Sequence, residues 1–188
     1  MGKAANSSIS LKQIHVTDNF WNKYVHLVKD VIIPYQWDIL NDKLEDVETS
    51  HCIENFKIAA GEKEGEFQGA VFQDTDVAKW LEAVGFVLNY ERDEKLEELA
   101  DETIELIGRA QQPDGYLNTY FTIKEPDGRW SNLMEGHELY TAGHMIEAAV
   151  AYYEATGKRR FLEIVSKFAD LVCQTFGPEE GKIHGYPG

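Results

Sequence analysis

Apolar residues recur at helical spacing along most of the chain, and this pattern predicts an all-α protein. The first stripe occupies 20–31 at steps of three and four, behind Thr17 or Asp18 as the capping residue. Pro34 should interrupt this helix, because proline lacks the N–H that an inner turn needs. We expect helix to resume over 35–43.

The middle and end of the chain continue the helical pattern. A shorter apolar pattern over 52–60 predicts another helix, and the glycine-punctuated stretch 62–73 predicts a loop. Two pairs of longer helices follow. The expected ranges are 76–90 with 94–110, and 138–155 with 159–176.

The two helix pairs are similar to each other. A shift of 65 residues places Leu81-Glu82-Ala83 on Ile146-Glu147-Ala148. The first helix of each pair is apolar nearly all round and must be covered on several sides, whereas the second is amphipathic. Inner and outer helices that alternate in hairpins indicate a helical array or a closed double ring. Three such hairpins would form about half of an (α/α)6 barrel.

The chain as a whole fits part of one domain. We expect 1–188 to be the N-terminal portion of an (α/α)6 barrel domain, because its three hairpins leave the ring unclosed and it stops in the turn 185–188. Residues 1–10 are expected to be a flexible tail.

Composition and charge exclude several classes of protein. A net charge of −15 argues against a nucleic-acid partner, because such proteins rely on clustered cations. Much of the acidity lies in 91–105 and is interpreted as the solvated face of a helix. No apolar run is long enough for a membrane span, and no signal peptide is visible, so a cytoplasmic location is expected. The oligomeric state stays open, a homo-oligomer included.

The loop 112–136 is long for a connection between helices and contains two Pro-Asp-Gly turns. It carries four aromatic residues among polar ones. They could stack on sugar rings above a helical ring, or they could fill a minor core of the loop itself. These aromatic residues are Tyr116, Tyr120, Phe121 and Trp130.

Two histidines stand near the start of the last inner helix. A zinc-protease motif is excluded, because HExxH needs histidine where Thr141 stands. His137 and His144 share a helix face but lie about 10 Å apart along the axis, too far for one metal ion. His137 is a candidate pocket residue, because helical rings open their pocket at one end of the inner helices and His137 stands at such an end. His144 is either a core histidine with a satisfied hydrogen bond or a supporting pocket residue.

Three further polar residues are candidates. Asp74 and Asp76 could be a carboxylate pair for acid–base chemistry, or first-turn acids that cap the helix after them. Gln36 follows the helix-breaking Pro34 and could bind a ligand hydroxyl or satisfy the broken helix.

Several motifs in a fixed order resemble those of glycoside hydrolase family 127, whose characterised members are β-L-arabinofuranosidases. The similarity runs from about Leu11 to the last residue. The motifs are Pro34-Tyr35-Gln36-Trp37, Phe72-Gln73-Asp74-Thr75-Asp76-Val77, Gln112-Pro113-Asp114-Gly115-Tyr116, His137-Glu138-Leu139-Tyr140 and Gly185-Tyr186-Pro187-Gly188.

The resemblance implies an (α/α)6 barrel and retaining hydrolysis, with a zinc-bound cysteine thiolate as nucleophile and a glutamate as acid/base. In the family these groups belong to the later half of the barrel, so this chain is expected to hold no catalytic residue and no metal ligand. Zinc is expected in the full-length enzyme only. Cys52 and Cys173 match none of the family's ligands, and they are interpreted as a packing residue and an outer-helix core residue.

By the same resemblance, His137 corresponds to a histidine that binds arabinofuranose hydroxyls and Gln36 to a pocket glutamine. His144, Asp74 and Asp76 receive supporting roles. The sequence thus predicts the N-terminal part of a retaining glycoside hydrolase that removes β-L-arabinofuranosyl groups from glycans, with the fragment alone inactive. The alternatives are a non-catalytic helical-repeat binding module, or a barrel enzyme that acts on another glycan.

Overall fold

The structure, a computed structural model, describes residues 9–184, and it confirms an all-α protein built from helical hairpins. Every regular element in this range is helical, apart from one bridge between Phe176 and Ile183. No helix in the same range is long and apolar enough to cross a membrane. Residues 1–8 of the expected tail over 1–10, and the turn 185–188, lie outside the described residues.

The first helical region is one continuous rod of three segments, α1 (Trp21–Leu27), the π-helical turn η2 (Val28–Ile32) and α2 (Ile33–Leu40). The predicted break at Pro34 is therefore wrong. Proline has no N–H and crowds the carbonyl four residues before it, and the wider π turn accommodates both effects. After the π turn the α-helical geometry returns at Ile33, and the helix ends at Leu40, not at the predicted residue 43.

The start of this rod is capped by Asp18 and not by Thr17. Its Oδ1 accepts hydrogen bonds from the backbone N–H groups of Phe20 and Trp21, at 3.0 and 2.7 Å. A short 3₁₀ turn, η1 (Leu11–Gln13), precedes it.

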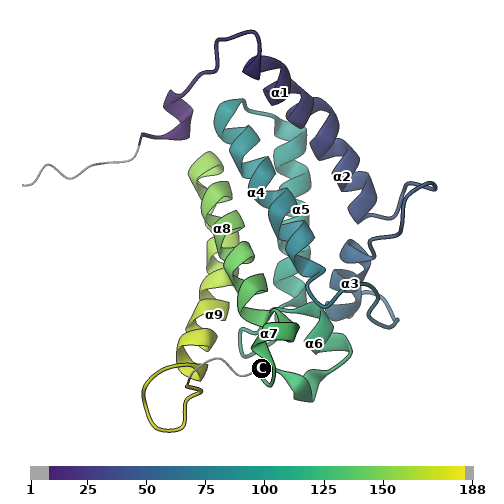
Figure 1. The fold of residues 1–188 in the computed structure, drawn as a ribbon, viewed down its shortest axis with the longest axis vertical. Coiled ribbons are helices and arrows are strands. Elements are labelled where there is room, and N and C mark those ends of the chain that lie inside the picture. Colours follow the sequence, from purple (N-terminus) through teal and green to yellow (C-terminus); the bar gives the residue numbers. More distant parts are fainter. Residues whose placement is uncertain (1–8, 185–188) are drawn as a thin grey trace, which may run out of the picture.

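The predicted hairpins are confirmed, with helix ends within two residues of those expected. Helix α3 precedes the predicted loop 62–73. The inner helices are α4 and α8, and the outer helices are α5 and α9 (Figure 1). Their bounds are α3 Cys52–Ala59, α4 Asp74–Tyr90, α5 Glu94–Ala110, α8 Glu138–Thr156 and α9 Arg160–Thr175.

Helices α4 and α8 pack side by side and run parallel (Figure 1). Their starts meet where the ring of Phe72 lies 5.2 Å from that of His137. Near their other ends, a Cβ on Gly85 would stand 2.8 Å from the carbonyl carbon of Ala151. Glycine at this position therefore lets the two helices approach closely.

The loop 112–136 folds into three short helices, α6 (Thr119–Ile123), η3 (Pro126–Gly128) and α7 (Leu133–Gly136). Two of its aromatic side chains, Tyr116 and Phe121, are buried. The minor-core interpretation is therefore correct for these two, and sugar stacking is wrong for them.

The two cysteines differ in their surroundings. Cys52 is fully buried, as the packing interpretation predicts, whereas Cys173 is exposed, so its assignment to the core is wrong. The buried stripe of α9 runs from Phe161 to Phe168 at steps of three and four, and position 173 falls off that stripe.

Candidate functional site

A cavity of about 730 Å³ lies between α2, the start of α4 and the loop before α3. Gln36 and Asp76, two predicted site residues, both line it. Gln73 and Lys79 complete the polar part of the wall, while Leu40 and Trp80 supply apolar surface. This size and this mixture of surfaces suit a small polar ligand.

The position of Gln36 depends on the packing of α2 against α4. The indole Nε1–H of Trp80, which is only 2% exposed, donates to the carbonyl of Ile33 at 3.1 Å. The neighbouring Trp37 ring lies 4.5 Å from that of Trp80. These contacts hold the turn of α2 that carries Gln36, whose own side chain stays exposed to the cavity.

Three side chains from the start of α4 form a connected polar group on the cavity wall. The amide of Gln73 donates to Asp76 Oδ2 at 3.0 Å, and Lys79 Nζ lies 3.9 Å from Asp76 Oδ1. Burial raises the pKa of Asp76, and the charge of Lys79 opposes that effect. The group offers an amide, a carboxylate and an ammonium, which together can bind ligand hydroxyls as donors and acceptors.

Sequence reasoning missed Gln73 and Lys79, although Gln73 stands in one of the quoted motifs and Lys79 follows two residues after that motif. A usable signal was present, because Lys79 follows Asp76 by three residues and Gln73 precedes it by three. Residues at this spacing share one face of a helix.

His137 lies at the start of α8, as predicted, but does not line this cavity. Its backbone is left-handed, with φ of 53°. Its Nδ1–H donates to the carbonyl of Glu135 at 2.8 Å, which leaves Nε2 on the other side of the ring to accept a hydrogen bond. Tyr140 connects the two regions, because its ring lies 5.7 Å from His137 and 5.5 Å from Lys79 Nζ.

Asp74 is buried and does not line the cavity. It is the first residue of α4, and its carboxylate accepts hydrogen bonds from Thr119. The residue before it, Gln73, is the N-cap of α4 and forms no side-chain cap hydrogen bond. Both aspartates are first-turn acids, but the carboxylate of Asp74 binds Thr119, the first residue of α6, and does not cap its own helix.

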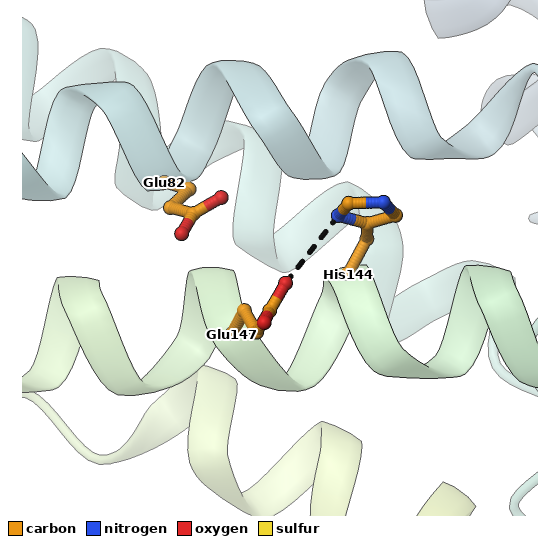
Figure 2. Close-up of side chains that lie close together, drawn as sticks. All are labelled: Glu82, His144 and Glu147. Carbon is orange, nitrogen blue, oxygen red and sulfur yellow. Dashed lines mark ion pairs between the residues drawn. The ribbon is translucent and has the colours of Figure 1, made fainter.

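His144 is half-buried on α8, two turns beyond His137. The ring lies 4.5 Å from that of Tyr140, edge to face. Its Nδ1 is buried from solvent and has no hydrogen-bond partner among the described residues. The expected core histidine with a satisfied hydrogen bond is therefore not found. Figure 2 shows its ring directed toward Glu82 of α4 and Glu147 of α8.

The zinc site that the resemblance implies does not fit the cysteines of this chain. The Cys52 thiol donates to the carbonyl of Gln73 at 3.0 Å, and burial, followed by the charge of Asp74, raises its pKa well above the ordinary value. A zinc ligand must be a thiolate, whereas these surroundings favour the thiol. Cys52 is therefore unsuited to hold zinc.

The inner helices α4 and α8 run parallel with the outer helices behind them, and the polar cavity lies at one end of α4. The family model for the catalytic domain of GH127 β-L-arabinofuranosidases matches residues 13–188 of this chain. The chain therefore belongs to glycoside hydrolase family 127.

Relatives support this assignment. A non-reducing end β-L-arabinofuranosidase from Bifidobacterium longum subsp. longum is 44% identical over 93% of this chain. The crystal structure of a GH127 β-L-arabinofuranosidase from Geobacillus stearothermophilus T6 is 63% identical over 93% of the chain, with a TM-score of 0.91. A further GH127 β-arabinofuranosidase structure is 35% identical over 96%, with a TM-score of 0.84.

The chain spans only part of each relative. It covers 29% of the curated Bifidobacterium protein, 27% of the Geobacillus structure and 29% of the third. The matched region thus corresponds to a little over a quarter of these glycosidases.

Proposed function

We propose that this chain is the part of a retaining glycoside hydrolase that forms one side of a pocket for a β-L-arabinofuranosyl group. The observation that carries the proposal is the 63% identity, over 93% of the chain, to a GH127 β-L-arabinofuranosidase. The polar cavity beside Gln36 supports it, because sugar hydroxyls need both donors and acceptors.

Within this proposal, Gln36 and His137 bind sugar hydroxyls. Gln36 offers an amide to the cavity, and His137 offers the Nε2 that its bond to Glu135 leaves available. Asp76 lies on the cavity wall and orients the amide of Gln73. Asp74 and His144 support the pocket from positions outside the cavity wall. The nucleophile and the acid/base glutamate are placed by the resemblance beyond residue 188.

The test is hydrolysis of an aryl β-L-arabinofuranoside by the full-length protein. We expect Gln36→Ala to lower kcat/KM by about ten- to a hundred-fold, the cost of leaving a polar partner unpaired. Gln174→Ala on the exposed side of α9 is the matched control and should keep the activity. A full-length protein that hydrolyses other aryl glycosides but not this one would contradict the substrate assignment.

His137 needs a different substitution, because alanine is disfavoured at a φ of 53°. His137→Gly suits that backbone and should keep Tm while lowering kcat/KM by at least about tenfold. Asn also tolerates the left-handed region and should restore part of the loss. Equal activity in the glycine and asparagine variants would argue against a hydrogen bond to the sugar.

The 188-residue chain by itself should show no turnover, because the reacting groups that the resemblance implies are not in it. Measurable hydrolysis by the purified chain would contradict this, and would return attention to Asp74 and Asp76 as an acid–base pair. Calorimetric titration of the same chain with arabinose tests for a sugar subsite. An absence of heat, combined with capture of a protein partner, would favour the binding-module alternative.

A further inference from the structure

Three potential metal ligands from two inner helices meet away from the sugar cavity. One donor atom each of Glu82, His144 and Glu147 lies within 4.8 Å of the other two. Glu82 comes from α4, and the other two come from successive turns of α8 (Figure 2). Neither Glu82, His144 nor Glu147 lines the cavity that holds Gln36.

The internal repeat explains why these side chains converge. Glu82 and Glu147 occupy equivalent positions, 65 residues apart, on parallel neighbouring helices. The same shift places Lys79 on His144, but Lys79 donates to Thr75 Oγ1 at 3.1 Å on its own helix. The cluster therefore contains two carboxylates and one imidazole, and Lys79, the residue equivalent to His144, takes no part in it.

The cluster is short of positive charge. The ion pair between His144 Nδ1 and Glu147 Oε2 spans 3.5 Å, which is longer than an ordinary hydrogen bond. Glu82 forms no ion pair with any lysine or arginine between residues 9 and 184. Two carboxylates that face each other without a cation repel each other, and a bound cation would remove that repulsion.

His144 gives an independent indication of a ligand. Its Nδ1 is buried from solvent, has no hydrogen-bond partner in the described range and points into the cluster (Figure 2). A buried polar atom without a partner costs free energy, and a bound ion or an ordered water is one way in which native proteins satisfy it. Coordination to a metal ion would satisfy this nitrogen.

We propose that Glu82, His144 and Glu147 bind a divalent transition-metal ion, with Zn²⁺ as the best fit. Imidazole nitrogen and carboxylate oxygen bind zinc at about 2.0–2.2 Å, which requires donor atoms about 3–4 Å apart. Rotation of the flexible glutamate side chains closes the gap from 4.8 Å. Three protein ligands leave a fourth position open, and Glu147, 64% exposed, allows solvent to reach it.

Such an ion would connect α4 to α8, and so one hairpin to the next. The proposed ion site is separate from the sugar cavity, because none of its three ligands lines that cavity. It also differs from the thiolate-bound zinc that the resemblance implies, because no cysteine is among its ligands. The proposal does not depend on the proposed function, since binding and glycoside hydrolysis are measured separately.

The test is calorimetric titration of the chelator-treated 188-residue chain with ZnSO₄, followed by thermal melting. We expect one ion per chain and a Tm rise of about 5–10 °C at a hundredfold excess over Kd. Glu82→Gln and His144→Ala should each weaken binding at least tenfold and, at the same zinc concentration, reduce the Tm rise to about half or less. Mg²⁺ should bind far more weakly, because imidazole favours zinc over magnesium.

The matched control is His26→Ala, which removes a surface histidine that lies 3.7 Å from Asp30 Oδ2 with helical spacing. This variant should bind zinc like the wild type. X-ray absorption of the zinc-loaded chain should show nitrogen and oxygen neighbours without sulfur. Unchanged affinity in both cluster variants, a sulfur neighbour, or equal loss in His26→Ala would overturn the proposal. Melting the metal-free variants checks that each one folds.

Discussion

Asp74 at the start of α4 accepts two hydrogen bonds from Thr119 at the start of α6, one from the backbone N–H at 2.7 Å and one from the hydroxyl at 2.5 Å. Both residues are buried. This pair ties the loop 112–136 to the end of the inner helix that carries the cavity wall. The Asp74 carboxylate and the loop 112–136 therefore together fix the start of α4, the helix that lines the candidate sugar cavity.

The Asp74–Thr119 pair should make stability depend on pH. Burial raises the pKa of Asp74 to about 6, even though the hydrogen bonds from Thr119 act to lower it. An unfolded aspartate has a pKa of about 3.9, so between about pH 4 and pH 6 the folded chain holds a proton that the unfolded chain has released. The free energy of unfolding should therefore fall as pH rises through this window, by as much as about 3 kcal/mol from this group.

Urea denaturation at pH 4, 5, 6 and 7 measures this effect. Asp74→Asn cannot ionise, so its stability should change less over the window than that of the wild type. Asp127→Asn alters an exposed carboxylate on η3 and serves as the control. An unaltered pH dependence in Asp74→Asn would show that the buried carboxyl is not the titrating group.

A second buried carboxyl, Glu138, should be sensitive to the loss of one donor. It accepts hydrogen bonds from the Tyr116 hydroxyl at 2.5 Å and from the Trp130 N–H at 2.7 Å. Tyr116→Phe leaves this buried carboxyl with an oxygen that has lost its donor, and we expect a loss of about 1–3 kcal/mol in the free energy of unfolding.

The control for this prediction is Tyr120→Phe, which removes a hydroxyl that donates to Glu125 at 2.7 Å on the surface. Because water can replace that exposed hydrogen bond, the change should stay below about 0.5 kcal/mol. Chemical denaturation of both variants at one pH decides the matter. If Tyr116→Phe and Tyr120→Phe lowered the free energy of unfolding equally, the buried hydrogen bond between Tyr116 and Glu138 would stabilise the chain no more than the exposed one does.

The long helices could be predicted from the sequence, and the buried polar contacts could not. Helix α5 begins at Glu94 and ends at Ala110 as its pattern indicates, because a capping aspartate and a one-sided apolar stripe are local signals. Asp74 and Thr119 are 45 residues apart, and no local pattern reports their contact. The first-turn position of Asp74 could be inferred, but its partner could not.

The candidate site was predictable to a similar extent. The motif order predicted Gln36 and Asp76, which share one cavity, and predicted His137 at the start of its helix. The sequence could not reveal that His137 lies outside the cavity of Gln36 and Asp76, because this depends on how α2, α4 and α8 are placed in space. The 65-residue repeat implied that Glu82 and Glu147 lie at the same level on neighbouring parallel helices, whereas the rotation that brings their side chains together could be learned only from the structure.

The closest approach of the two inner helices supplies the last prediction. A Cβ on Gly85 would lie 2.8 Å from the carbonyl carbon of Ala151 and 2.9 Å from the N of Tyr152, and backbone atoms cannot rotate away. Gly85→Ala should therefore force α4 and α8 apart and lower the free energy of unfolding by about 1–3 kcal/mol. Gly143→Ala on α8 meets no atom within 4 Å, so it should stabilise the chain by up to about 1 kcal/mol through helix propensity. Thermal and urea denaturation of the two variants should give changes of opposite sign, and a stabilised Gly85→Ala would contradict the close packing.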